Sequence, residues 1–168
     1  MKHLKTFILL VIAFITISAS CKKTTDPRPS DFYFRCKING QLYIPNSCAN
    51  CLSFKLLEDT SLIANANAGF ETIRFGINDL TGIQVKTYNL INQIGNRATY
   101  KNSTTTDDYY RSQNYNPGNL TITELNKTNR TIRGNFNFVA YHSFRPNDSL
   151  IITEGPFMRN MLSINYPC

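Results

Sequence analysis

The segment Thr131–His142 constrains the fold of this chain most, because apolar and polar side chains alternate along it. Ile132, Phe136 and Phe138 fall on one side of an extended strand, and Arg133 falls on the other. A period of two residues is that of a β-strand with one buried face, whereas a helix repeats its apolar positions every three or four residues. We therefore predict a long, half-buried strand at 131–142.

Shorter alternating segments, separated by turn residues, follow one another from residue 32 onwards, and none has apolar residues at helical spacing over three turns. Asn39 and Gly40 form a strong hairpin signal. The other expected strands are 32–38, 41–44, 52–57, 61–66, 72–77, 83–90, 98–101, 120–125, 149–154 and 161–166. This spacing predicts an all-β domain at 32–168, a two-sheet antiparallel β-sandwich of Ig-like or jelly-roll-like type, with a β-barrel as the alternative.

Four cysteines fall in this predicted domain: Cys36, Cys48, Cys51 and Cys168. An even number of cysteines in an oxidising compartment indicates two disulfides. We predict Cys48 with Cys51 and Cys36 with Cys168. Two alternatives for the Cys48-x-x-Cys51 motif stay open, half of a zinc site and a redox pair. A zinc site needs further ligands, and a thioredoxin-like motif needs a βαβ unit.

The N-terminus has the three parts of a secretory signal. Lys2 and Lys5 are followed by an apolar run at 7–17, and small residues precede Cys21. The run is too short for a helix that spans a membrane, which needs about 20 apolar residues. We therefore expect a signal peptide at 1–20. The polar, proline-containing segment 21–31 is expected to be a flexible tether.

The sequence Ser18-Ala19-Ser20-Cys21 resembles the lipobox of bacterial lipoproteins. That resemblance implies cleavage before Cys21, acylation of its thiol and a lipid anchor in the cell envelope, on the outer membrane. The membrane is thus the first expected partner. More than one acyl chain is needed for stable anchoring.

Basic residues exceed acidic ones by seven, and they are scattered along the chain without a run. Nucleic-acid binding needs such residues gathered on one face. We therefore expect no nucleic-acid partner, and at most weak attraction to anionic lipid or polysaccharide.

Candidates for catalysis are few. His142 stands beside Ser143, but no Gly-x-Ser-x-Gly nucleophile motif occurs, and we expect His142 to be a surface residue at the end of a strand. The carboxylate pairs Glu58-Asp59 and Asp107-Asp108 lie in expected turns, where a solvated role is usual, although a surface calcium site at 107–108 stays open. We predict a non-enzymatic protein with no cofactor and no metal.

The segment 102–119 is long for a loop in a compact domain, and such loops are usually functional or disordered. It contains Tyr109, Tyr110, Arg111 and Tyr115 among Asn, Gln and Ser. Tyrosines give rigid contact area and the polar side chains give adaptable hydrogen bonds, as in binding loops. These four residues are our ligand-binding candidates, for a glycan or an envelope protein. The alternative is an extended hairpin whose tyrosines pack on the edge of the sandwich.

Three motifs resemble those of small uncharacterised lipoproteins of the Bacteroidota: Ile38-Asn39-Gly40, Gly134-Asn135-Phe136-Asn137-Phe138 and Gly155-Pro156-Phe157. The resemblance spans residues 32–160 and implies a lipid-anchored β-sandwich without an assigned activity. Asp148-Ser149-Leu150 also resembles the short O-glycosylation motif of exported Bacteroidota proteins, which makes Ser149 a candidate acceptor.

Overall fold

The structure is a computed structural model, and it describes residues 33–48, 50–93, 95–102 and 109–163. These residues form twelve strands and no helix. The strands are β1 (Tyr33–Phe34), β2 (Cys36–Ile38), β3 (Gln41–Tyr43), β4 (Leu52–Leu57), β5 (Ser61–Ala68), β6 (Glu71–Asn78), β7 (Thr87–Leu90), β8 (Arg97–Asn102), β9 (Tyr109–Arg111), β10 (Gly118–Asn126), β11 (Thr131–His142) and β12 (Ser149–Ser163).

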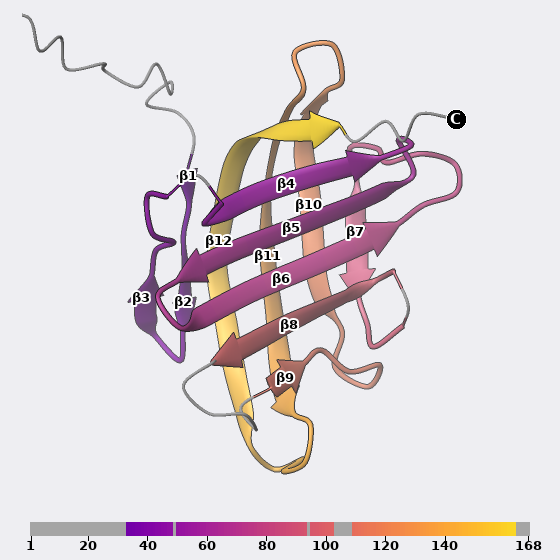
Figure 1. The fold of residues 1–168 in the computed structure, drawn as a ribbon. Coiled ribbons are helices and arrows are strands. Elements are labelled where there is room, and N and C mark those ends of the chain that lie inside the picture. Colours follow the sequence, from indigo (N-terminus) through magenta and orange to yellow (C-terminus); the bar gives the residue numbers. More distant parts are fainter. Residues whose placement is uncertain (1–32, 49, 94, 103–108, 164–168) are drawn as a thin grey trace, which may run out of the picture.

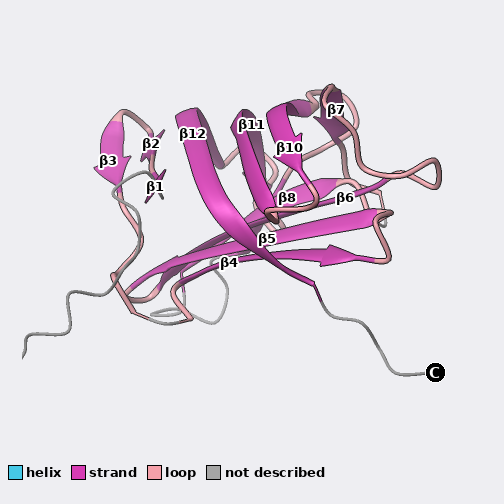
Figure 2. Cartoon of the chain, turned by 90° about the horizontal axis from the view of Figure 1, so that it is seen from above, coloured by secondary structure: helices cyan, strands magenta, loops and turns pink. Residues whose placement is uncertain are grey.

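The strands form two layers with the core between them (Figure 1). The strands are hydrogen-bonded into one continuous sheet. This sheet folds into a layer of β4, β5, β6 and β8 and a layer of β2, β3, β7, β10, β11 and β12. Figure 2 shows the two layers edge-on, with β12 running from one to the other. The all-β, sandwich-like fold predicted from the alternation is confirmed, and the barrel alternative is not needed.

Hydrogen bonding passes between the layers at two places. β9 pairs with β8 on one side and with β11 on the other. β12 pairs with β11 along most of its length, and then its last residues pair with β4. The β12–β4 pairing is parallel, so the prediction of a purely antiparallel arrangement is wrong at this one joint.

The burial pattern follows the predicted alternation. Inward positions of β11 are buried along its whole length, and the bounds of β4 and β11 are those predicted. The centre of the core is a cluster of five phenylalanine rings with neighbouring centroids 5.0 to 6.5 Å apart. They come from both layers and are Phe34, Phe54, Phe75, Phe136 and Phe157.

Two Gly-x-Phe motifs face each other in the β11–β12 pair. Gly134 lies opposite Phe157, and Phe136 lies opposite Gly155. A Cβ atom added at Gly155 would lie 2.6 Å from the Phe136 ring. One added at Gly134 would clash with the Thr121 carbonyl oxygen and would also lie 2.7 Å from the Phe157 ring. Each ring therefore covers the glycine of the other strand. This packing explains why both glycines occur inside strands, where glycine usually weakens pairing.

The predicted turn at Asn39 and Gly40 is confirmed, since both residues have positive φ angles, 49° and 83°. That combination is the one required by the tight hairpin turn for which Asn-Gly is favoured. The long strand expected at 32–38 is interrupted at Arg35, whose backbone N–H donates to Pro156 of β12.

Candidate functional site

The outer face of β4, β5, β6, β8 and β9 gathers basic side chains that are far apart in the sequence. On this face, which is turned towards the reader in Figure 1, residues point outward at every second position of each strand. No outward position of these five strands carries an acidic side chain. We call the surface the cationic face, and its basic residues are Lys55, Arg74, Arg97, Lys101 and Arg111.

The strand register brings three of these cations close together. Arg74 lies opposite Thr99, and Thr99 lies opposite Arg111. Arg97 lies opposite Gly76, two positions further along β6. Side chains directly opposite in a sheet have Cβ atoms about 5 Å apart. The Debye length is about 10 Å at 0.1 M salt, and these charges are separated by about that distance or less. Salt therefore screens them only in part, and their positive potentials add.

Most cations on this face have no counter-charge among the described residues. Within the described ranges, Lys55, Arg74, Arg97 and Lys101 form no ion pair and no side-chain hydrogen bond. Elsewhere on the described domain five cations pair with carboxylates, while Arg35 and Arg130 do not. The pairs are Lys37 with Glu154, Lys86 with Asp79, Lys127 with Asp59, Arg133 with Glu124 and Arg145 with Asp148. Four of the cations without a counter-charge in the described structure thus lie on one face, although the basic residues are scattered along the sequence.

A hollow of about 190 Å³ opens in the middle of the cationic face. Gly76 is at its floor, because a residue with no side chain leaves a gap between Ile63 and Arg97 in the cross-strand row. Arg74, Arg97 and Tyr109 are among the lining residues, together with the hydroxyl-bearing Ser61 and Thr99. The hollow thus combines two guanidinium groups with hydroxyl groups and one aromatic ring.

The four ligand-binding candidates of the segment 102–119 do not share one surface. Tyr110 is buried, with its ring centroid 5.8 Å from Tyr100, and its hydroxyl donates to Asp148 over 3.1 Å. Tyr110 is therefore not exposed to a ligand, and its packing is that of the alternative, a hairpin whose tyrosines lie against the sandwich. The pattern missed strand β9, whose alternation turns Tyr110 inward and its two neighbours outward.

The other three candidates lie at the end of the cationic face. Arg111 donates to the Ser143 hydroxyl over 3.1 Å, and its guanidinium lies 5.6 Å from the centroid of the Tyr109 ring. Tyr115 is 70% exposed, and its ring centroid is 5.1 Å from that of Tyr141. Since β9 lies between β8 and β11, Arg111 connects the cationic face to this tyrosine pair.

His142 and Ser143 are not arranged as a catalytic pair. His142 is 3% exposed rather than a surface residue, and its Nδ1 accepts hydrogen bonds from the backbone N–H groups of Phe144 and Arg145. The Ser143 hydroxyl instead donates to the carbonyl of Tyr109. This geometry orders the turn after β11, and within the described residues the Ser143 hydroxyl donates to a backbone carbonyl rather than to the base that a serine nucleophile requires.

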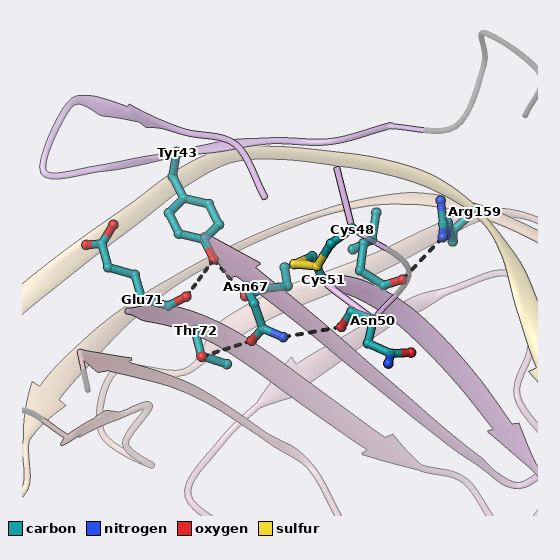
Figure 3. Close-up of a disulfide and its surroundings, with 10 residues drawn as sticks. Tyr43, Cys48, Asn50, Cys51, Asn67, Glu71, Thr72 and Arg159 are labelled. Carbon is teal, nitrogen blue, oxygen red and sulfur yellow. Dashed lines mark hydrogen bonds between the residues drawn. A yellow bond between two sulfur atoms is a disulfide. The ribbon is translucent and has the colours of Figure 1, made fainter. Parts of the chain in front are cut away.

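Cys48 and Cys51 form the predicted disulfide, which closes the turn before β4 (Figure 3). Asn67 of β5 connects this turn to the sheet. Its backbone N–H donates to the Cys51 carbonyl, its side-chain N–H donates to the Asn50 carbonyl, and its side-chain oxygen accepts from Thr72. The contacts of the turn are those of a structural crosslink at the corner of the sandwich.

Cys36 has no disulfide partner among the described residues; Cys168 lies outside them, so the bond between the two stays a prediction. The residue is an inward position of β2 and is 1% exposed, so a partner sulfur would have to enter the core. Burial, and then the Glu71 carboxylate, raises the pKa of Cys36 to about 12. Burial also raises the pKa of Tyr43, whose hydroxyl donates to the Ala66 carbonyl over 2.6 Å.

Several predicted residues lie outside the described residues: Cys21, Cys168, Asp107 and Asp108. Ser149 is described and is exposed at the start of β12, where a modifying enzyme could reach it. Glu58 and Asp59 form the β4–β5 turn with positive φ angles, and Asp59 pairs with Lys127.

Among the residues with described coordinates, no cluster of three or more His, Cys, Asp or Glu side chains could hold a metal ion. The same residues contain no helix long and apolar enough to cross a membrane.

The fold and this surface define a class of protein: a two-layer all-β domain with a charged outer face on one sheet. The family model described as a domain of unknown function (DUF6252) matches residues 30–160, and the chain belongs to this family. Comparison with curated proteins and with solved structures found no match.

Proposed function

We propose that the protein is a non-enzymatic binding module of the cell envelope, and that it holds an anionic polysaccharide on the cationic face. The observation that supports this proposal is the group of five basic side chains on one sheet face, four of them without a counter-charge in the described structure. A repeating anionic polymer complements such a surface, because several of its charges can be neutralised at once.

Polysaccharide fits this face better than nucleic acid or a membrane. The positions between the cations carry amides and hydroxyls, such as Asn65, Thr72 and Ser53, which match the hydroxyls of sugars. Single-stranded nucleic acid is bound by stacking successive bases on aromatic rings, and Tyr109 is the one aromatic residue among the outward positions of these five strands. A membrane-binding surface needs a band of protruding apolar side chains, which this face lacks.

The proposed function includes a location in the cell. We infer from the lipobox-like sequence that Cys21 is acylated and anchors the protein to the outer membrane, as in the Bacteroidota lipoproteins that the chain resembles. Residues 21–31 would then hold the binding domain away from the lipid surface.

Binding to polygalacturonate, measured by biolayer interferometry, tests the function. We expect the full chain, kept in detergent because of its apolar run at 7–17, to bind this polymer and not neutral dextran. Raising sodium chloride from 0.05 to 0.5 M should weaken binding at least tenfold, because the Debye length shortens. The double substitution Arg74→Gln/Arg97→Gln should weaken it by a similar factor.

The matched control is Arg130→Gln/Arg133→Gln, which removes the same charge away from the cationic face. Equal losses in the two variants would mean that only net charge matters, and would contradict a dedicated face. Preference for single-stranded DNA or for anionic vesicles over polygalacturonate would replace polysaccharide with that partner.

A second candidate function is a glycan-binding accessory domain that stacks a neutral sugar on Tyr115. The observation in its favour is the exposed ring of Tyr115 against Tyr141, whose hydroxyl accepts a hydrogen bond from Asn116 over 3.0 Å. Selective binding on a neutral glycan array that is lost in Tyr115→Ala would support it. Absence of glycan binding altogether would favour an envelope protein as the partner.

A further inference from the structure

We propose that the hollow over Gly76 is a subsite for one anionic sugar unit, and that it binds the acidic group of that unit specifically. This inference rests on the proposed function and names the part of the ligand that the site recognises. A subsite of this kind differs from a surface that attracts any negative charge, because it also selects the shape of the ligand.

The composition of the hollow favours an acidic group. Arg74 and Arg97 both line it, and guanidinium groups bind carboxylate, sulfate or phosphate oxygens through paired N–H donors. Neither guanidinium is occupied by another described side chain. Their donors are therefore available to a ligand.

The remaining lining residues fit the rest of a sugar. Ser61 offers a hydroxyl group for hydrogen bonds to ring hydroxyls, whereas the buried Thr99 hydroxyl donates to the Arg74 carbonyl over 3.4 Å and has only its oxygen left to accept. Tyr109, with the Arg111 guanidinium 5.6 Å from its ring centroid, is the aromatic lining residue. Sugar-binding surfaces need such a combination of an aromatic ring and convergent polar groups.

The size of the hollow favours one unit of a polymer. Its volume of about 190 Å³ is below the roughly 300 Å³ at which ordinary small-molecule pockets begin. A single sugar would therefore bind weakly by itself, while neighbouring units on the cationic face add affinity through effective concentration.

Gly76 allows the subsite to be filled without disturbing the sheet. A Cβ atom added there would lie 3.5 Å from the Gly95 carbonyl oxygen and 3.7 Å from the Leu62 carbonyl oxygen, which are ordinary contacts. The variant Gly76→Val adds an isopropyl group to the outer face while leaving every charge in place. Valine is also favoured in strands, so we expect the variant to fold.

The test is titration of the full chain in detergent with galacturonate, followed by NMR, with galactose as the uncharged probe. We expect wild type to bind galacturonate and not galactose. Gly76→Val should weaken galacturonate binding at least tenfold, while its affinity for polygalacturonate at 0.05 M salt falls less than threefold. The matched control Ser53→Val adds apolar volume to the same face outside the hollow and should leave galacturonate binding unchanged.

A second variant, Arg97→Lys, keeps the charge but removes the paired donors. We expect it to weaken galacturonate binding at least fivefold and polygalacturonate binding less than threefold. Unchanged galacturonate binding in Gly76→Val or in Arg97→Lys, or equal binding of galactose by wild type, would overturn the subsite. In those cases polygalacturonate binding that still depends on Arg74 would leave the proposed function intact. If the wild-type protein does not bind polygalacturonate, the proposed function itself is overturned.

Discussion

The reciprocal cover of Gly155 by Phe136 makes a definite prediction about stability. In Gly155→Ala the new Cβ would lie 2.6 to 2.7 Å from three atoms of the Phe136 ring, closer than real contacts allow. The ring cannot move aside easily, because it is 1% exposed and its centroid lies 5.1 Å from Phe34 and 5.0 Å from Phe75. Overpacking of this kind costs about 1 to 3 kcal/mol of unfolding free energy.

The matched control is Gly76→Ala, which introduces the same methyl group into a strand without a clash. Relief of glycine flexibility should stabilise that variant by about 0.5 to 1 kcal/mol. The two alanine variants should therefore differ by about 1.5 to 4 kcal/mol, which corresponds to roughly 5 to 15 °C in Tm for a domain of this size.

Urea unfolding followed by far-ultraviolet circular dichroism measures this difference, and the chain has no tryptophan to complicate the spectrum. Adding Phe136→Leu to Gly155→Ala should recover part of the loss, since the smaller side chain removes the clash. Equal unfolding midpoints for Gly155→Ala and Gly76→Ala, or strict additivity of Gly155→Ala and Phe136→Leu, would refute the packing argument.

Three further predictions concern the cysteines. Replacing both Cys48 and Cys51 with serine should lower the unfolding free energy by about 2 kcal/mol, because the disulfide closes a loop of only a few residues, and calorimetry would check this. The folded-state pKa of about 12 for Cys36 exceeds that of an unfolded thiol, near 9, so its contribution to stability is full below pH 9 and is lost as the pH rises towards 12. Urea unfolding at pH 8 and pH 10 should show this loss, and Cys36→Ala should make it smaller. Cys21→Ser should move the protein from the membrane fraction to the soluble fraction of its host, and retention on the membrane would contradict lipid anchoring.

The local pattern predicts where a strand begins and ends better than it predicts which strands pair with one another. Thr131–His142 and Leu52–Leu57 have the predicted bounds because alternation is a property of the strand itself. Strand β9 has only three residues, too few for an alternation of buried and exposed positions to be recognised in the sequence. The sequence therefore does not predict that Tyr110 points into the core. The segments 149–154 and 161–166 were predicted as separate because Gly155 and Pro156 interrupt the pattern, although β12 is continuous through them.

The cationic face depends on information that no single segment contains. Alternation already places Arg74 outward on its strand, as it does Lys55. What brings them to one surface is the order of strands, since β6 pairs with β8 and the intervening β7 belongs to the other layer. The charge pattern along the chain could therefore suggest candidate residues but not a common site.

The position of β12 has a consequence for how the chain acquires its structure. This last strand is the hydrogen-bonding partner of β1, β2 and β4, which are among the first strands in the sequence. Pairing of Ile38 with Ile152 joins residues more than a hundred positions apart. Contacts of such long range slow folding, because closing so long a loop costs conformational entropy before the contact forms. During synthesis, the edges of the N-terminal strands therefore stay unpaired until almost the whole chain has been made. A protein truncated before β12 should aggregate rather than fold.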